Sequence, residues 1–105
     1  MEISFCDARL CAVFNSHSLL QRTYDRSLAH SIAVRMGMLA AAPNLAAIPV
    51  RPPIGLKVQN KTCTVSLSGG FKLQFRPQDG FTRSSTPVLE KVTAIEIIEV
   101  LGAGR

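Results

Sequence analysis

The chain has 105 residues, of which 47% are hydrophobic and 18% charged, as in a globular domain rather than a disordered segment. Twelve basic and seven acidic residues give a formal net charge of +5, which favours nucleic acid or another acidic partner. Residues 1–105 are predicted to form a single domain. With no long apolar run and no signal-like N-terminus, the sequence predicts a cytoplasmic protein that contacts no membrane.

The N-terminal half is predicted to be one strand followed by helices. Residues 2–6 alternate apolar and polar side chains, which predicts a short strand, and Asp7 suits the N-cap of a first helix. After a break at residues 15–18, the chain could continue this helix or form another helical turn. The apolar spacing over residues 28–39 predicts a second helix, capped by Asp25 or Ser27.

The second helix is expected to end at Pro43-Asn44, and its face opposite the apolar one carries Arg26, His30 and Arg35. Three prolines then predict an irregular connection to a strand at residues 54–58. A hairpin follows at 61–76, a polar loop at 77–87 and a β-branched strand at 91–100, expected at a central position. The predicted class is α+β, with two N-terminal helices packed on a mainly antiparallel four- to five-stranded sheet.

The hairpin has a readable register. If Ser68-Gly69-Gly70 is a three-residue loop, apolar residues of the two arms oppose each other on one face. These pairs are Leu67 with Phe71, Val65 with Leu73 and Cys63 with Phe75. The other face then pairs Ser66 with Lys72, Thr64 with Gln74 and Thr62 with Arg76. This second face is expected to be solvent-exposed, rich in hydroxyl groups and cationic.

One long stretch of the chain contains basic residues but no acidic residue. Between Asp25 and Asp79 the sequence contains seven cations and no Asp or Glu. They are Arg26, Arg35, Arg51, Lys57, Lys61, Lys72 and Arg76. Such a stretch indicates a surface that binds a polyanion.

The remaining residue types argue against other chemistry. Cys6, Cys11 and Cys63 have no paired metal spacing and are expected to be reduced core thiols, so no metal or cofactor is predicted. The two histidines are expected on the surface, away from the sheet. Glu96 and Glu99 lie three apart in a strand and are expected to face opposite ways, which argues against a paired-carboxylate site.

Four segments carry a resemblance to a known family: Leu-Ala-Ala-Ala-Pro-Asn-Leu at 39–45, Leu-Lys at 56–57, residues 71–76 and residues 92–100. In order and spacing they resemble the HigB-type plasmid-maintenance killer toxins of the RelE superfamily, over nearly the whole chain. The resemblance implies a type II toxin that cuts messenger RNA on the ribosome without a metal, inhibits translation and is held inactive by a helix-turn-helix antitoxin.

Metal-free RNA cleavage needs a base for the 2′-hydroxyl, charge stabilisation on the phosphorane and an acid for the leaving oxygen. Lys72 and Arg76 suit phosphate binding and charge stabilisation, and Lys57 or Lys61 could act as the base. RNA contacts are expected from six further residues: Arg51, Thr62, Thr64, Ser66, Gln74 and Arg105.

The sequence also departs from the family. Ile54 replaces a usual His, Lys72 replaces a usual Arg, and the C-terminal Tyr and His are absent. The alternative is therefore a degenerate homologue that binds RNA, ribosome or antitoxin without cleaving. Because the missing Tyr and His remove a proton donor and an orienting group, RNA binding is expected to survive better than cleavage. A structural domain with no role on RNA is the third reading.

Overall fold

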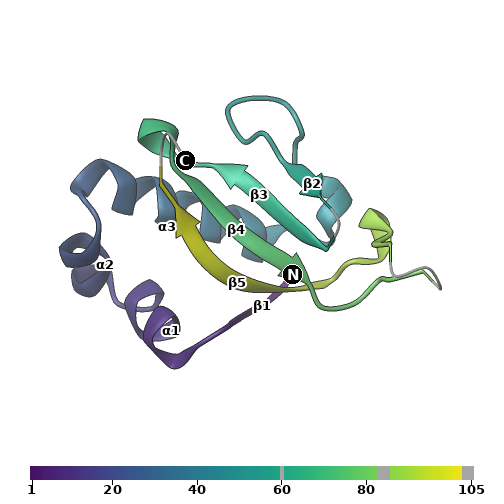
Figure 1. Cartoon of the computed structure of the whole chain (residues 1–105), viewed down its shortest axis with the longest axis horizontal. Helices are drawn as coiled ribbons and strands as arrows, with labels where there is room; N and C mark the ends of the chain where they lie inside the picture. The colour runs from purple at the N-terminus through teal and green to yellow at the C-terminus, as the bar shows by residue number, and fades with distance from the viewer. Residues whose placement is uncertain (60, 83–85, 103–105) are drawn as a thin grey trace.

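A five-stranded sheet forms one layer of the computed structural model, which describes residues 1–59, 61–82 and 86–102 (Figure 1). The strand order is β1-β5-β4-β3-β2. Their bounds are β1 (Glu2–Phe5), β2 (Lys57–Gln59), β3 (Thr62–Ser66), β4 (Lys72–Pro77) and β5 (Ala94–Leu101). β1 runs parallel to β5, and the other neighbours are antiparallel. The α+β class is confirmed, and so is the central position of the last strand.

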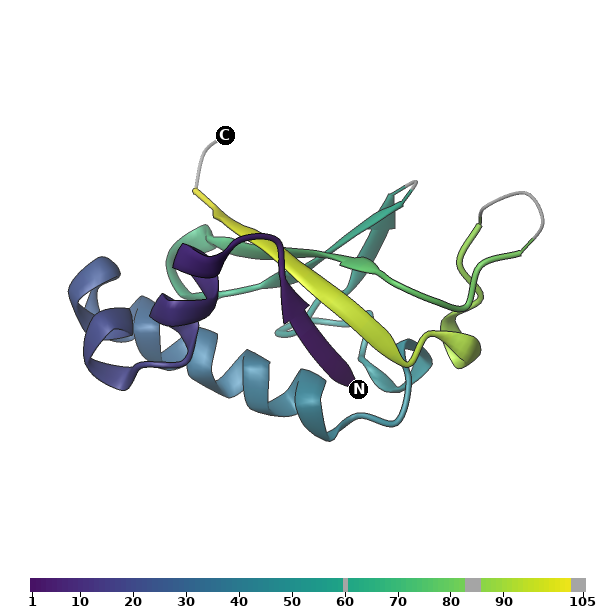
Figure 2. The ribbon, with the colours of Figure 1, turned by 90° about the horizontal axis from the view of Figure 1, so that it is seen from below.

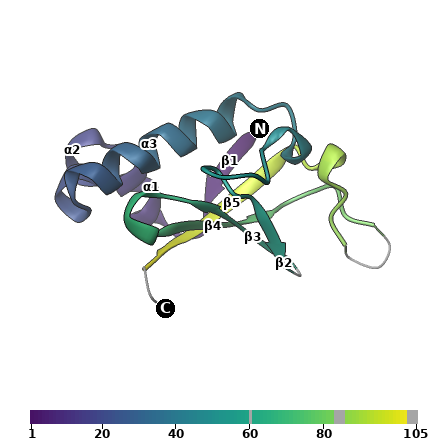
Figure 3. The ribbon, with the colours of Figure 1, turned by 90° about the horizontal axis from the view of Figure 1, so that it is seen from above.

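Three helices form the second layer: α1 (Ala8–Phe14), α2 (His17–Thr23) and α3 (Arg26–Ala41). Figures 2 and 3 show α3 running along one face of the sheet, with α1 and α2 gathered at one end of it. The predicted number of two N-terminal helices is wrong. After the break, Ser16 caps a new helix, because its hydroxyl accepts a hydrogen bond from the backbone N–H of Leu19. Asp7 caps α1 and Asp25 caps α3 in the same way, each through a backbone N–H in the first turn of its own helix.

The core lies between α3 and the central strands. Leu73 and Phe75 of β4, Ile95 and Ile97 of β5, and Ile32 of α3 are all 0% exposed and belong to one cluster. The alternating burial along β4 and the first half of β5 follows from the period of two in a strand. As predicted, the apolar face of the hairpin is turned inward, and its opposite face is turned to solvent.

The predicted hairpin register is confirmed wherever β3 and β4 pair. The observed partners are Cys63 with Phe75, Thr64 with Gln74, Val65 with Leu73, and Ser66 with Lys72. The backbone N–H of Leu67 donates to the carbonyl of Phe71 at 2.8 Å and closes the loop. Gly69 and Gly70 have φ of +69° and +79°, a backbone conformation that glycine adopts without steric cost.

The tip of this hairpin is attached to α3. The Ser31 hydroxyl accepts a hydrogen bond from the backbone N–H of Ser68 at 3.1 Å. Arg35 Nε donates to the carbonyl of Ser66 at 2.8 Å. Arg35 therefore holds the hairpin against the helix, and its predicted place on the outer face of α3 is wrong, whereas Arg26 and His30 are exposed as predicted.

Two strand boundaries differ from prediction. The strand predicted at 54–58 begins only at Lys57, because the N–H of Gly55 (φ +61°) donates to the carbonyl of Arg51 and forms a turn there. The last strand begins at Ala94 rather than residue 91, because η3 (Leu89–Lys91) is a 3₁₀ turn. It also extends to Leu101, a residue without a strand signal of its own.

The cysteines are all free, but only Cys63 is the buried core thiol that was predicted. Burial raises the pKa of Cys63 to about 11. Cys6 is exposed and Cys11 is partly exposed, so the prediction of core thiols is wrong for these two. Among the residues that the structure describes, no helix is both long enough and apolar enough to cross a membrane.

The same Gly→Ala change is expected to have opposite effects at two positions. A Cβ at Gly37, in the interior of α3, would meet nothing within 4 Å, whereas at Gly80 (φ +77°) it would lie 2.7 Å from the Lys91 backbone. Gly37→Ala should raise the free energy of unfolding by about 0.5–1 kcal/mol. Gly80→Ala should lower it by about 2 kcal/mol or more. Urea denaturation measures both, and a stabilising Gly80→Ala would contradict the described turn.

Candidate nucleic-acid interface

The sheet face turned away from α3, here called the polar face, carries polar side chains in rows that cross the strands. Directly opposed residues share a face, so the register defines these rows. One row consists of Lys57, Thr64, Gln74 and Glu99, and the next of Ser66, Lys72 and Leu101. Each of these residues is partly or fully exposed.

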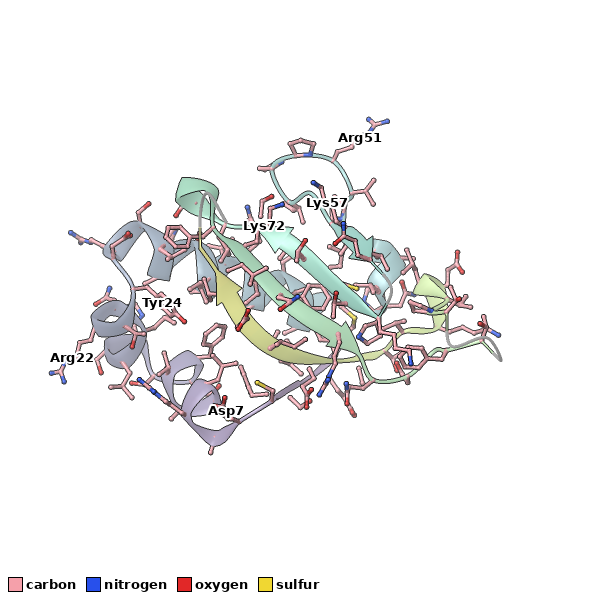
Figure 4. The ribbon with its side chains drawn as sticks, in the orientation of Figure 1. Asp7, Arg22, Tyr24, Arg51, Lys57 and Lys72 are labelled. Carbon is pink, nitrogen blue, oxygen red and sulfur yellow. The ribbon has the colours of Figure 1, made fainter. Side chains whose placement is uncertain are left out.

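A hollow of about 400 Å³ lies over the β2, β3 and β4 side of the polar face. We call it the lysine hollow, and it is lined by Lys57, Gln59, Thr62, Thr64, Gly70, Lys72, Gln74, Leu101 and Gly102. Figure 4 shows Lys57 and Lys72 close together on this face, on either side of β3, whereas Arg22 points away from it. Two strand spacings across the sheet and one row along it, about 12 Å in all, separate their backbones, a distance that two flexible lysine side chains can span.

A β-bulge in β5 decides which side chains stand beside the lysine hollow. The pairing with β4 passes from Phe75–Ile97 to Gln74–Glu99 and skips Ile98. The additional residue shifts the inward–outward alternation of the strand by one place. Glu96 and Glu99 therefore both lie on the polar face, and the prediction that they face opposite ways is wrong because it assumed an unbroken period of two.

Arg76 is paired with one of these carboxylates. Its guanidinium forms an ion pair with Glu96, and Arg76 Nε donates to Glu96 Oε1 at 2.6 Å. The Arg76 side chain is 51% exposed, and an exposed pair of this kind contributes only about 0–1 kcal/mol. The predicted cationic face is therefore mixed: lysines lie over β2 and β4, and carboxylates lie on β5.

The structure brings only part of the predicted site together. Lys57, Lys72, Thr62, Thr64 and Gln74 line the lysine hollow. Ser66 lies beside Lys72 on the polar face but is not among the lining residues.

The other predicted residues lie elsewhere. Lys61 is exposed before β3, outside the lining of the hollow. Arg51 extends from the loop before β2 and points away from the sheet in Figure 4. Arg105 lies outside the described residues. The acid-free stretch of the sequence is therefore distributed over several surfaces.

Sequence reasoning missed Gln59, which lines the hollow, and Glu99, which borders it. A signal for Glu99 was present. Residues 95–100 read apolar, polar, apolar, apolar, polar, apolar, and two adjacent apolar residues inside an alternating strand indicate a bulge. Read in that way, the segment places Glu99 on the same face as Glu96.

The chemistry of this face is that of cations, hydroxyls and amides with a carboxylate at the border. Within residues 1–59, 61–82 and 86–102, no group of three or more His, Cys, Asp or Glu side chains could hold a metal ion. His17 and His30 are exposed and line a separate hollow between α2 and α3. Ammonium groups of this kind can bind phosphate, and a carboxylate can accept a proton in a reaction.

Comparison with known protein families, with curated proteins and with solved structures found no match to this chain.

Replacing Glu96 is expected to strengthen binding of a single-stranded oligonucleotide. Glu96→Gln releases Arg76 from its ion pair and adds one free cation to the polar face. The affinity should rise about two- to fivefold, and the slope of log affinity against log salt should steepen by about 0.7. Fluorescence anisotropy at several salt concentrations measures both. Glu90→Gln, an equal charge change at exposed η3, is the control, and an equal effect of both variants would contradict a local role of Arg76.

Proposed function

We propose that this chain is a HigB-type toxin that binds messenger RNA in the lysine hollow and cleaves it on the ribosome. The observation that carries the proposal is the placement of Lys57 and Lys72 in one hollow with Glu99 at its border. The sequence resemblance supplies the substrate and the ribosomal setting. An RNA strand offers what this face can recognise, a row of phosphates next to ribose hydroxyls.

Phosphate binding rests on two lysines that form no ion pair with any described residue. Within the described part of the chain, the only ion pair is Arg76 with Glu96, so Lys57 and Lys72 keep their charge available. The threonine hydroxyls and glutamine amides between them offer hydrogen bonds to phosphate and sugar oxygens. Contacts of this type position a strand without reading its sequence.

Cleavage requires a base and an acid, and the sequence offered candidates only for the base. With Glu99 at the border of the lysine hollow, the proposed roles change: the carboxylate becomes the base, and a lysine is left to act as the acid. Glu99 opposes Gln74 and Leu101 opposes Lys72, so Glu99 and Lys72 are diagonal neighbours. Diagonal neighbours lie about 7–8 Å apart, within reach of long side chains. In the proposed reaction the Glu99 carboxylate takes the proton of the 2′-hydroxyl, which attacks the adjacent phosphorus.

The two lysines complete the proposed reaction. Lys72 stabilises the negative charge of the phosphorane, and the Lys57 ammonium donates a proton to the departing 5′-oxygen. The products are a 2′,3′-cyclic phosphate and a 5′-hydroxyl, and no metal takes part. Lys57 thus acts as an acid here rather than as the base first considered, because Glu99 takes the role of the base.

The second candidate is a homologue that binds RNA, ribosome or antitoxin without cleaving. It is favoured by the absence of the C-terminal Tyr and His that the family uses. Under both candidates the partner that neutralises the chain is a helix-turn-helix antitoxin. Such a partner would carry acidic residues opposite Lys57 and Lys72 or opposite Arg26, because Arg35 and Arg76 are already engaged within the chain.

The lysine hollow makes a quantitative prediction about salt. Two phosphate contacts on a single strand give a slope of about −1.4 in log affinity against log salt, and each lost contact removes about 0.7. In Lys57→Ala and in Lys72→Ala the slope should become shallower by about 0.7, as measured by fluorescence anisotropy with a short RNA. Lys91→Ala, an exposed lysine of η3, is the control and should leave the slope unchanged. A wild-type slope near −5 would show that all seven cations of the acid-free stretch contact phosphates. It would contradict RNA binding through the two lysines of the hollow alone.

Glu99→Gln is expected to separate cleavage from binding. The amide cannot accept the 2′-hydroxyl proton, so cleavage of messenger RNA in a translation extract should fall at least about 100-fold, while RNA affinity remains within about threefold. Glu90→Gln serves as the control of equal charge change. Unchanged cleavage in Glu99→Gln would exclude Glu99 as the base. If the wild-type protein binds RNA but does not cleave it, the second candidate is favoured.

A further inference from the structure

The end of β1 is bonded to both carbonyls that flank the bulge position of β5. The backbone N–H of Cys6 donates to the carbonyl of Ile97 at 3.0 Å. The Cys6 thiol lies 3.2 Å from the carbonyl oxygen of Ile98, to which it donates. In a regular strand successive carbonyls point to opposite neighbours, so two consecutive carbonyls bonded to one residue mark the distorted segment.

The carbonyl of Ile98 has its hydrogen-bond partner outside the β4–β5 ladder. A bulge leaves its extra residue without a place in the ladder, and the register between β4 and β5 skips Ile98. An S–H group is a weak donor, but it occupies the position where a donor is required. Glu99 follows Ile98 directly, so the orientation of Glu99 depends on the conformation of the bulge.

We infer that Cys6 is a positioning residue, whose thiol holds the bulge at Ile98 and thereby keeps the Glu99 carboxylate on the polar face. The consequence for catalysis rests on the proposed function; the structural role does not. Cys6 acts only through Ile98 and contacts no RNA, and Lys57 and Lys72 stand on β2 and β4 rather than on β5.

The surroundings of Cys6 suit a donor rather than a nucleophile. Desolvation and the charge of the neighbouring Asp7 raise the pKa of the Cys6 thiol above its usual value of 9.0. The thiol is therefore protonated at neutral pH and retains the hydrogen that Ile98 accepts. Asp7 Oδ2 lies at 3.7 Å, a longer contact than the one to Ile98, and Asp7 Oδ1 accepts from the N–H of Leu10 at the α1 N-cap.

The groove between β1, α1 and α3 supplies a matched control. Cys6 and Cys11 both line this groove. The Cys11 sulfur accepts a hydrogen bond from Asn15 Nδ2 within the first helical segment. Cys11→Ala therefore removes a thiol from the same groove without removing a bond to β5.

The first measurement is amide hydrogen exchange of residues 98–100 by NMR, on the full chain. Cys6→Ala should exchange about two- to fivefold faster there, because the bulge loses a weak hydrogen bond and opens more often. Cys11→Ala should match the wild type, and Cys6→Ser, which keeps a donor, should restore slow exchange. Wild-type exchange rates in Cys6→Ala, or equal acceleration in the Ala and Ser variants, would overturn the inference.

The second measurement is the cleavage rate of the same variants. Cys6→Ala should lower kcat about two- to fivefold with KM unchanged, because the lysines that bind RNA are not affected, and Cys6→Ser should recover the rate. Faster exchange with an unchanged kcat would overturn the link between the bulge and catalysis. If the wild type cleaves no RNA, the proposed function fails, and the exchange experiment still decides the role of Cys6.

Discussion

Two sets of apolar side chains in β5 must reach the same core, and the bulge at Ile98 is what allows it. Ile95 and Ile97 are buried in the first half of the strand, whereas in the second half Val100, opposite Leu73, packs against the core. In an unbroken strand the odd and even positions would face opposite sides, and Val100 would point to solvent. The outward position of Glu99 is thus a consequence of burying its neighbour Val100.

The site is also tied to the helical layer. Arg35 and Ser31 bind the hairpin tip, and Lys72 begins the strand that leaves this tip. The position of one of the two lysines is therefore set by hydrogen bonds between the backbone of the hairpin tip and side chains of a 16-residue helix, rather than by a free loop. Side chains on rigid elements are held more accurately than side chains on loops, so the RNA contact proposed for Lys72 would start from a fixed position.

Most of the local structure could be predicted from the sequence, because the relevant interactions are local. The hairpin register follows from its loop and its alternation, and the helix starts follow from Asp7 and Asp25 as caps. The candidate site was predicted only in part. The pairing of Arg76 with Glu96 joins residues that are twenty positions apart, and it exists only because β4 and β5 are neighbours. The parallel pairing of β1 with β5 likewise depends on sheet order, to which no short sequence pattern corresponds.

The order of the strands also limits how the sheet can associate with itself. The two outermost strands are the shortest, with four residues in β1 and three in β2, while the longer β4 and β5 lie inside the sheet. Unpaired backbone groups at an edge are the template for strand-to-strand aggregation, and short edges carrying charges such as Lys57 oppose it. The longest and most β-branched strand, which would aggregate most readily if exposed, is paired with β4 along one side and, over residues 94–97, with β1 along the other.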